Sequence, residues 1–286
     1  MRRGPISRAL EREGTLAFWL LAPTLLILTV FIAYPFVLGV WLSLSNATVG
    51  EPGHFIGLAN FYKIFDDSIF RTAALNTFVY TGITTVFKLA LGLWAWIRAF
   101  ILLPFIIPTV LSTLAWKWMF DPTFSVFNWL FWKLHIINSR INWLGDPELA
   151  MGSITIVNVW RGVPFYAISL LAGLQTINPD LHEAAAIDGA NRFQRFWYVT
   201  WPLLLPVTMV VVLFSVIQTF ADFQLVYVLT GGGPANATHL FATYAYQIGI
   251  GTGLLSEGAA ISLAMFPALL LVVVFQLWYI RKVENR

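Results

Sequence analysis

The sequence predicts an all-α integral membrane protein with six transmembrane helices, and three observations lead to this class. Of the 286 residues, 58% are hydrophobic and only 11% are charged, which is more apolar surface than a soluble core buries. The apolar residues form long uninterrupted runs, and most Lys and Arg residues stand at the ends of these runs. Both features are typical of chains that cross a bilayer.

Each candidate span is an apolar run of about 20 residues, because a helix with a rise of 1.5 Å per residue needs that length to cross the hydrocarbon core. Six runs qualify, at residues 16–44, 73–96, 99–120, 151–175, 203–230 and 258–280. The first run is too long for a secretory signal and lacks a small-residue cleavage site, so we interpret it as a retained span. Residues 1–15 are then a cytoplasmic N-terminal segment, and residues 16–286 a single transmembrane domain.

The distribution of basic residues predicts the orientation of these spans. Of the 17 Lys and Arg residues, ten lie in the N-terminal segment, near Arg98, within 176–202 and at the C-terminus, whereas five lie in the opposite loops. Loops rich in Lys and Arg stay in the cytoplasm. We therefore expect both termini and the segment 176–202 to face the cytoplasm.

The junction between the second and third runs is unusual. A single helix over residues 73–120 would be about 70 Å long, more than twice the thickness of a bilayer. The chain must turn, yet LWAWIRAFILL supplies one Arg and no turn residue. We therefore hypothesise that a short cytoplasmic loop near Trp94 to Arg98 is missing from the sequence.

Several functions are disfavoured by the composition. Cysteine is absent and the four His residues are scattered, which argues against a metal centre. The basic residues form no single patch, so nucleic acid is not an expected partner. The glycine-rich GGGP at 231–234 lacks the Gly-Lys-Ser/Thr of a nucleotide-binding loop. We expect no enzymatic activity and no cofactor in this chain, and any ATP and Mg²⁺ must bind to a partner subunit.

The polar stretch NPDLHEAAAIDGANRFQRF begins at Asn178 and interrupts the apolar pattern between the fourth and fifth runs. Asn178 or Asp180 is a suitable helix cap, and Pro179 suits the first helical position. Gly189 is suited to end the helix, because glycine adopts the left-handed conformation at little cost. The stretch therefore predicts a helix, a glycine turn and a second helix over about 178–202. An ordinary amphipathic connector at the membrane surface is the alternative.

The spacing of this stretch resembles the EAA loop of permease subunits of bacterial ABC importers. Glu183, Ala184 and Ala185 are followed by Gly189 and then by Val199, Trp201 and Pro202, where Val199 and Trp201 depart from the usual Ile-x-Leu-Pro ending. The resemblance extends over nearly the whole chain. It is greatest to the sugar-importer branch that includes the larger maltose permease subunit and the glycerol-3-phosphate permeases.

The resemblance implies a type I, maltose-permease-like bundle in the cytoplasmic membrane of a bacterium or archaeon. It also implies four partners besides membrane lipid: a second permease subunit, two ATP-binding subunits and an external solute-binding protein. The EAA loop would form a coupling helix that docks on an ATP-binding subunit. The residues implied for this coupling are Glu183, Ala184, Ala185, Asp188, Gly189 and Arg192.

Three ionisable residues lie inside predicted spans and well away from the outer ends of those spans, where charge is costly and commonly functional: Lys88, Arg161 and Asp222. Helical rise places Arg161 about 15 Å and Asp222 about 12 Å below the outer surface. Arg161 and Asp222 therefore lie at a similar depth. They could form a structural ion pair, or both could bind a solute. The long stem of Lys88 could instead carry its charge out to the interface.

The resemblance also implies a solute pathway on the fourth and fifth spans. Its two stretches here are NVWRGVPF, in which Arg161 replaces an apolar residue, and SVIQTFADF. The implied pathway residues are Asn158, Arg161, Gly162, Phe165, Ser215, Gln218, Thr219 and Asp222. An aromatic face with several amide and hydroxyl groups suits a sugar or sugar derivative. For Asn158, Gln218 and Thr219, hydrogen bonding between helices is the alternative.

Together these observations predict the permease subunit of an ATP-driven, binding-protein-dependent ABC importer. An ion-coupled secondary transporter that uses Arg161 and Asp222 is the first alternative, but it leaves the EAA spacing unexplained. A membrane enzyme acting on lipid would need a cluster of acidic or His residues at an interface, and the sequence contains none.

Overall fold

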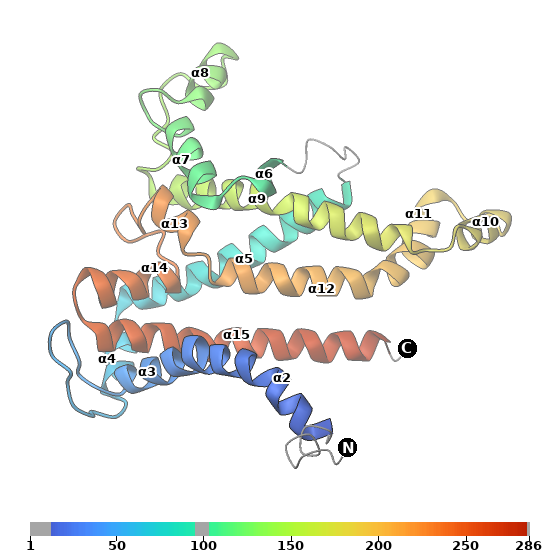
Figure 1. Cartoon of the computed structure of the whole chain (residues 1–286). Helices are drawn as coiled ribbons and strands as arrows, with labels where there is room; N and C mark the ends of the chain where they lie inside the picture. The colour runs from blue at the N-terminus through green and yellow to red at the C-terminus, as the bar shows by residue number, and fades with distance from the viewer. Residues whose placement is uncertain (1–12, 95–102, 285–286) are drawn as a thin grey trace, which may run out of the picture.

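The computed structural model describes residues 13–94 and 103–284, and within these ranges the chain is almost entirely helical (Figure 1). Extended backbone pairs there only in two isolated bridges, Ser45 with Phe55 and Thr48 with Glu51. Five helical segments are long and apolar enough to cross a membrane: Ala17–Ser43, Ser68–Leu93, Pro147–Gln175, Arg192–Phe220 and Leu255–Lys282. The all-helical membrane class predicted from the sequence is confirmed.

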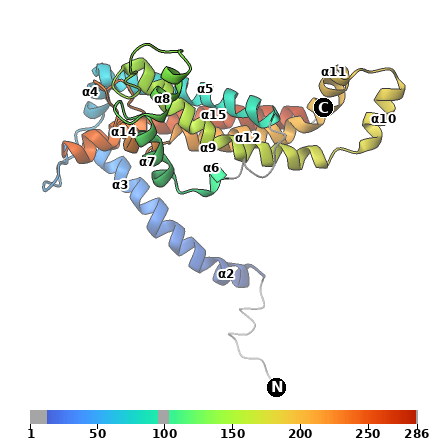
Figure 2. The same cartoon turned by 90° about the horizontal axis from the view of Figure 1, so that it is seen from above.

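Only part of the first segment packs against another long helix. It consists of α2 (Glu13–Leu28), the π-helical η1 (Thr29–Ala33) and α3 (Tyr34–Ser43). Figure 2 shows α2 leading away from the rest of the molecule, whereas the end of α3 packs against α15 (Leu255–Glu284). None of the most apolar part of this segment is buried within the chain.

Three further long helices surround the interior: α5 (Ser68–Trp94), α9 (Pro147–Gln175) and α12 (Trp201–Phe220). Each of the three packs against the other two, and α15 packs against α12 (Figure 1). Helix α9 begins four residues before the predicted run because Asp146 caps it, accepting hydrogen bonds from the backbone N–H groups of Glu148 and Leu149 at 3.0 and 3.1 Å.

The predicted third span is not one continuous helix over its described part. Residues 103–119 form α6 (Leu103–Ile106) and α7 (Thr109–Met119), and Pro108 between them has an extended ψ of 136°. Proline has no N–H and disfavours helical backbone in the residue before it, so the break has a local cause. The short α8 (Val126–Lys133) follows α7 in the chain. The hypothesised missing loop falls on residues 95–102 and so lies outside the described residues.

The predicted fifth span also differs from expectation. Helix α11 (Arg192–Arg195) runs through the π-helical η3 (Phe196–Thr200) into α12, so the helix begins eleven residues earlier than position 203. It ends at Phe220, and the short α13 (Gln224–Leu229) follows after a break. The break carries Asp222, whose Oδ1 accepts a hydrogen bond from the backbone N–H of Leu225 at 3.4 Å and so begins the next helix.

The end of the bundle away from the C-terminus of α15 contains α4 (Ala59–Asp66), α14 (Phe241–Tyr246), η4 (Gln247–Gly251) and the glycine-rich loop (Figure 1). The segment 231–234 is a loop, as expected. Gly232 has φ +95°, and a Cβ there would lie 2.0 Å from the His239 ring, so the loop needs glycine at this position. The His239 side chain is buried against this loop, and burial lowers the pKa of its imidazole.

The interior of the bundle has a polar layer between two apolar clusters. One cluster includes Tyr80, Ile154 and Leu225, and the other includes Tyr166 and Leu204. On α9 and α12, the polar residues predicted from the sequence lie between these clusters along the chain. The fold therefore positions one polar layer at the centre of three packed helices.

Candidate functional site

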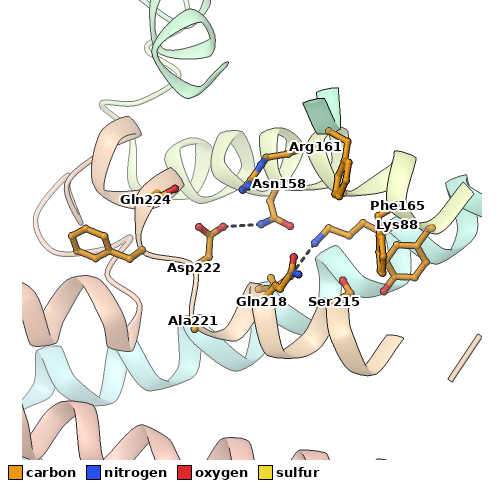
Figure 3. Close-up of a pocket in the computed structure, with 14 residues that line it drawn as sticks. Lys88, Asn158, Arg161, Phe165, Ser215, Gln218, Ala221, Asp222 and Gln224 are labelled. Atoms are coloured by element: carbon orange, nitrogen blue, oxygen red, sulfur yellow. Dashed lines mark hydrogen bonds between the residues drawn. The ribbon is translucent and has the colours of Figure 1, made fainter. Parts of the chain in front are cut away.

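A pocket of about 450 Å³ lies within this polar layer, and all eight predicted pathway residues line it (Figure 3). Helix α9 contributes Asn158, Arg161, Gly162 and Phe165, α12 contributes Ser215, Gln218 and Thr219, and Asp222 follows in the break after α12. Both sets have the spacing i, i+3, i+4, i+7, which places side chains on one face of a helix. The two faces meet across the pocket.

Part of the remaining wall comes from α5 and α6, which the predicted pathway did not include. Lys88 lies on α5 and Phe105 on α6. The interpretation that Lys88 reaches the interface is wrong. Its side chain is only 4% exposed, and its Nζ donates to Thr219 Oγ1 at 2.9 Å, so the ammonium points into the protein.

Gly162 makes this position of Lys88 possible. A Cβ at position 162 would lie 2.4 Å from Lys88 Cε and 3.1 Å from its Nζ. The lysine stem therefore crosses the surface of α9 where α9 has no side chain. This contact gives a physical reason for glycine at a position that the resemblance alone had suggested.

Asp222 is held by two neighbouring helices. Its Oδ2 accepts hydrogen bonds from Tyr80 on α5 at 2.9 Å and from Asn158 on α9 at 2.8 Å. The expected alternative of an ion pair with Arg161 is wrong, because Lys63–Glu257 is the only salt bridge within 4.0 Å among the described residues. Asp222 thus joins α5, α9 and the end of α12 through neutral donors.

Several polar atoms at the pocket have no hydrogen-bond partner in the described structure. They are Asn158 Oδ1, Tyr166 OH and Ser215 Oγ, all buried on residues that line the pocket. Buried polar groups are normally paired, so these three atoms are free to bind water or a solute. The aromatic rings of Phe105 and Phe165 lie nearly parallel, with centroids 6.2 Å apart, and form an apolar part of the wall.

The pocket contains no metal centre. No group of three or more His, Asp or Glu side chains within residues 13–94 and 103–284 is arranged to hold a metal ion. The site is suited to hydrogen bonding and charge pairing with a solute.

The predicted helix–turn–helix is present as α10 (Pro179–Ile187) followed by α11. Asn178 caps α10 by accepting from the backbone N–H of Asp180 at 3.0 Å, and Gly189 has φ +83°, as the turn requires. Asn191 and Gln194 form a reciprocal capping box at the start of α11. The loop projects beyond the ends of α9 and α12, on the side where α15 ends (Figure 1).

The six predicted coupling residues all lie on this loop and face outward. Glu183, Ala184, Asp188, Gly189 and Arg192 are exposed, and Ala185 is partly buried. Neither α10 nor α11 has a buried residue. Large apolar side chains are exposed here too, with Ile187 at 87% and Phe193 at 73%. The role of the six predicted residues in coupling stays a prediction.

Long apolar helices arranged around a buried polar pocket are the arrangement expected of a membrane transport subunit. Comparison with known proteins gives the family. Residues 93–285 match the family described as "Binding-protein-dependent transport system inner membrane component". The chain belongs to this family and is a multi-pass permease subunit of the inner membrane.

Individual relatives match over nearly their full length. The chain is 35% identical to the trehalose/maltose transport system permease protein MalF of Thermococcus litoralis, with 96% of each chain covered. It is 34% identical to the sulfoquinovosyl glycerol transport system permease protein SmoG of Agrobacterium fabrum, with 94% of this chain and 91% of the relative covered. A chain from a bacterial ABC transporter involved in the import of the acidic polysaccharide alginate has the same fold, with a TM-score of 0.80, 22% identity and coverage of 98% and 99%.

Proposed function

We propose that this chain forms half of the translocation pathway of an ATP-driven importer for a sugar or sugar derivative. The observation that carries the proposal is the central pocket, which combines unpartnered hydroxyl and amide oxygens with the paired rings of Phe105 and Phe165. Sugars present an apolar ring face and many hydroxyl groups, and this combination binds both. A volume of about 450 Å³ accommodates one or two sugar rings.

The relatives support a sugar but leave its chemistry open. Their names include trehalose and maltose, which are neutral, and sulfoquinovosyl glycerol, which carries a sulfonate. The diacetylchitobiose uptake system permease protein DasB of Streptomyces coelicolor, 30% identical, adds an amide-bearing sugar. The names of these proteins therefore all refer to sugars, but the sugars differ in the substituents they carry.

In the proposed complex, a second permease subunit, two ATP-binding subunits and an external solute-binding protein accompany this chain. The bundle is of type I, with six spans and both termini in the cytoplasm, and the 99–120 run contributes its third span. ATP and Mg²⁺ bind to the partner subunits. A solved complex of the alginate transporter with its alginate-bound periplasmic protein supports the external partner.

Coupling is proposed to occur through α10. A short capped helix with exposed alanines allows close approach of a partner, and Glu183 offers a carboxylate for a charge-assisted hydrogen bond at its rim. ATP-driven closure of the partner subunits would then move α9 and α12, to which the loop is attached at both ends. Solute would pass from the binding protein to the pocket and then to the cytoplasm.

The test is reconstitution of the chain with a second permease, an ATP-binding subunit and a solute-binding protein in proteoliposomes. We expect ATP-dependent uptake of radiolabelled sugar, and we expect Glu183→Ala to reduce uptake at least tenfold while solute binding persists. Glu148→Ala is the matched control, because this exposed glutamate lies at the opposite end of α9. Uptake driven by a proton or sodium gradient without ATP would contradict the proposal and favour the ion-coupled alternative.

A further inference from the structure

The charge balance of the pocket deepens the proposed function, on which the following inference rests. Three ionisable side chains line the pocket. Lys88 and Arg161 are cations, and Asp222 is a carboxylate. With all three in their usual charge states, the pocket carries one excess positive charge. A purely neutral solute would leave that charge without a counterion in a low-dielectric interior, where charge is costly.

The carboxylate does not neutralise either cation by direct contact. Both neutral donors to Asp222, Tyr80 and Asn158, bind the same oxygen, Oδ2, and the other oxygen faces the backbone N–H of Leu225. No Lys or Arg nitrogen lies within 4.0 Å of Asp222 among the described residues. Asp222 is therefore occupied in joining three helices rather than in pairing with Lys88 or Arg161.

The two cations have unused hydrogen-bond donors. An ammonium has three donors, and Lys88 uses one of them on Thr219 Oγ1. A guanidinium has five donors in a planar fork, and the described structure contains no hydrogen bond from Arg161 to any protein acceptor. Figure 3 shows both side chains directed into the pocket, Lys88 from α5 and Arg161 from α9.

The two side chains also differ in how firmly they are held. Lys88 is 4% exposed and lies against Gly162, so its ammonium is a fixed charge at one wall. Arg161 is only partly buried and has a flexible stem, which lets its fork turn toward a bound group. A fixed ammonium and an adjustable guanidinium together match a group with two or three equivalent anionic oxygens.

We propose that Lys88 and Arg161 form an anion-binding subsite that selects a sugar bearing a carboxylate or sulfonate substituent. Arg161 donates from its fork to two oxygens of that substituent, and Lys88 supplies a second charge on the α5 side. The sugar ring then lies toward Phe165 and the free oxygens of Asn158 and Ser215. A neutral sugar of the same shape is disfavoured, because it leaves both cations without an anionic partner.

The test compares two pairs of probes in the complete reconstituted importer with its binding protein. The pairs are cellobiose with cellobiouronic acid, and glucose with 6-deoxy-6-sulfoglucose, so that each pair differs only in one substituent. We expect ATP-dependent uptake of the acidic member of at least one pair to exceed that of its neutral partner at least tenfold. Preference for the neutral member in both pairs would overturn the anion-binding subsite but leave the sugar permease in place. If no probe is taken up in an ATP-dependent manner, both proposals fail.

Variants separate the subsite from the rest of the pocket. Arg161→Gln should reduce the ratio of acidic to neutral uptake at least tenfold, and Arg161→Lys should restore part of it because the charge is kept. Arg71→Gln makes the same substitution at an exposed arginine near the start of α5 and should leave the ratio unchanged. An equal loss of acidic and neutral uptake in Arg161→Gln, with no recovery in Arg161→Lys, would contradict the subsite. The wild-type preference is measured without any variant and tests the proposal even if Arg161→Gln does not fold.

Discussion

The pocket between α5, α9 and α12 and the loop formed by α10 and α11 differ in what holds their side chains in place. At the pocket, Asp222 is bound by residues from two other helices, and Lys88 is bound by Thr219 from a third. On the loop, the hydrogen bonds that fix the backbone come from neighbours in sequence, such as Asn178 with Asp180. The pocket is shaped by tertiary contacts within this chain, whereas the loop is shaped by local ones.

The two regions also differ in how far their side chains are exposed. The pocket residues Asn158, Thr219 and Asp222 are each less than 9% exposed. In contrast, Ile187, Phe193 and Tyr198 in and next to the loop are 87%, 73% and 80% exposed. Exposed apolar side chains in and next to this helix–turn–helix support the docking role proposed for the loop.

The largest change in stability should come from removing Asp222, the residue that joins the pocket helices. Asp222→Ala leaves the Tyr80 hydroxyl and the Asn158 amide without an acceptor, at a cost of about 1–3 kcal/mol for each buried donor. We expect a clear decrease in the thermal unfolding midpoint of the purified importer in detergent. Gln224→Ala changes an exposed pocket residue and is the control. Equal stability of the two variants would show that tertiary contacts do not hold the pocket together.

A substitution at the glycine turn of the loop should cause a smaller and local loss of stability. Gly189→Ala places a side chain at φ +83°, which costs about 1–2 kcal/mol, although nothing lies within 4 Å of the new Cβ. Hydrogen exchange of residues 183–195 should accelerate several-fold while exchange at the pocket is unchanged, and transport per ATP should fall. Gly50→Ala introduces the same strain at φ +90° in an outer loop, also in open space, and should not alter transport per ATP. If both variants lose transport per ATP, backbone strain causes the loss wherever it is introduced, and the position of Gly189 on the loop has no special role.

The smallest change in stability should accompany loss of a hydroxyl that has no partner. Tyr166→Phe removes a buried OH without a hydrogen bond, so the free energy of unfolding should stay within about 0.5 kcal/mol of the original value. The apparent KM for sugar should rise about three- to tenfold, since that hydroxyl is available to the solute. Tyr80→Phe is the matched variant, because its OH donates to Asp222 and its loss should destabilise the protein. A destabilised Tyr166→Phe would show that this hydroxyl is structural.

The parts of the site that were predicted from the sequence are those with a strong local signal. Charged side chains are rare in apolar helices, so Lys88, Arg161 and Asp222 were singled out and do line one pocket, whereas Asn158 was inferred from the family resemblance. The helix–turn–helix was predicted because a cap and a glycine lie at fixed positions in the sequence. Such signals need no knowledge of the neighbouring helices.

The remaining features depend on contacts between segments that are distant in sequence. Tyr80 and Tyr166 resemble ordinary apolar residues of a span, and only the packing reveals that one binds Asp222 and the other lines the pocket. Lys88 was expected to reach the interface because nothing in its own helix shows that Gly162 makes room for it. A signal was nevertheless present: Thr81, Thr84, Thr85 and Lys88 have on α5 the same spacing i, i+3, i+4, i+7 as the two predicted sets of pocket residues.

The contact between Gly162 and Lys88 suggests how the preference of such a carrier could diverge during evolution. A single methyl group at position 162 would push the lysine stem away from α9 and move its charge, with no change in the number of charged residues. Solute preference would then be retuned by one neutral substitution on a different helix from the charge itself. A laboratory search for altered preference would begin with small residues at position 162, before any ionisable residue is replaced.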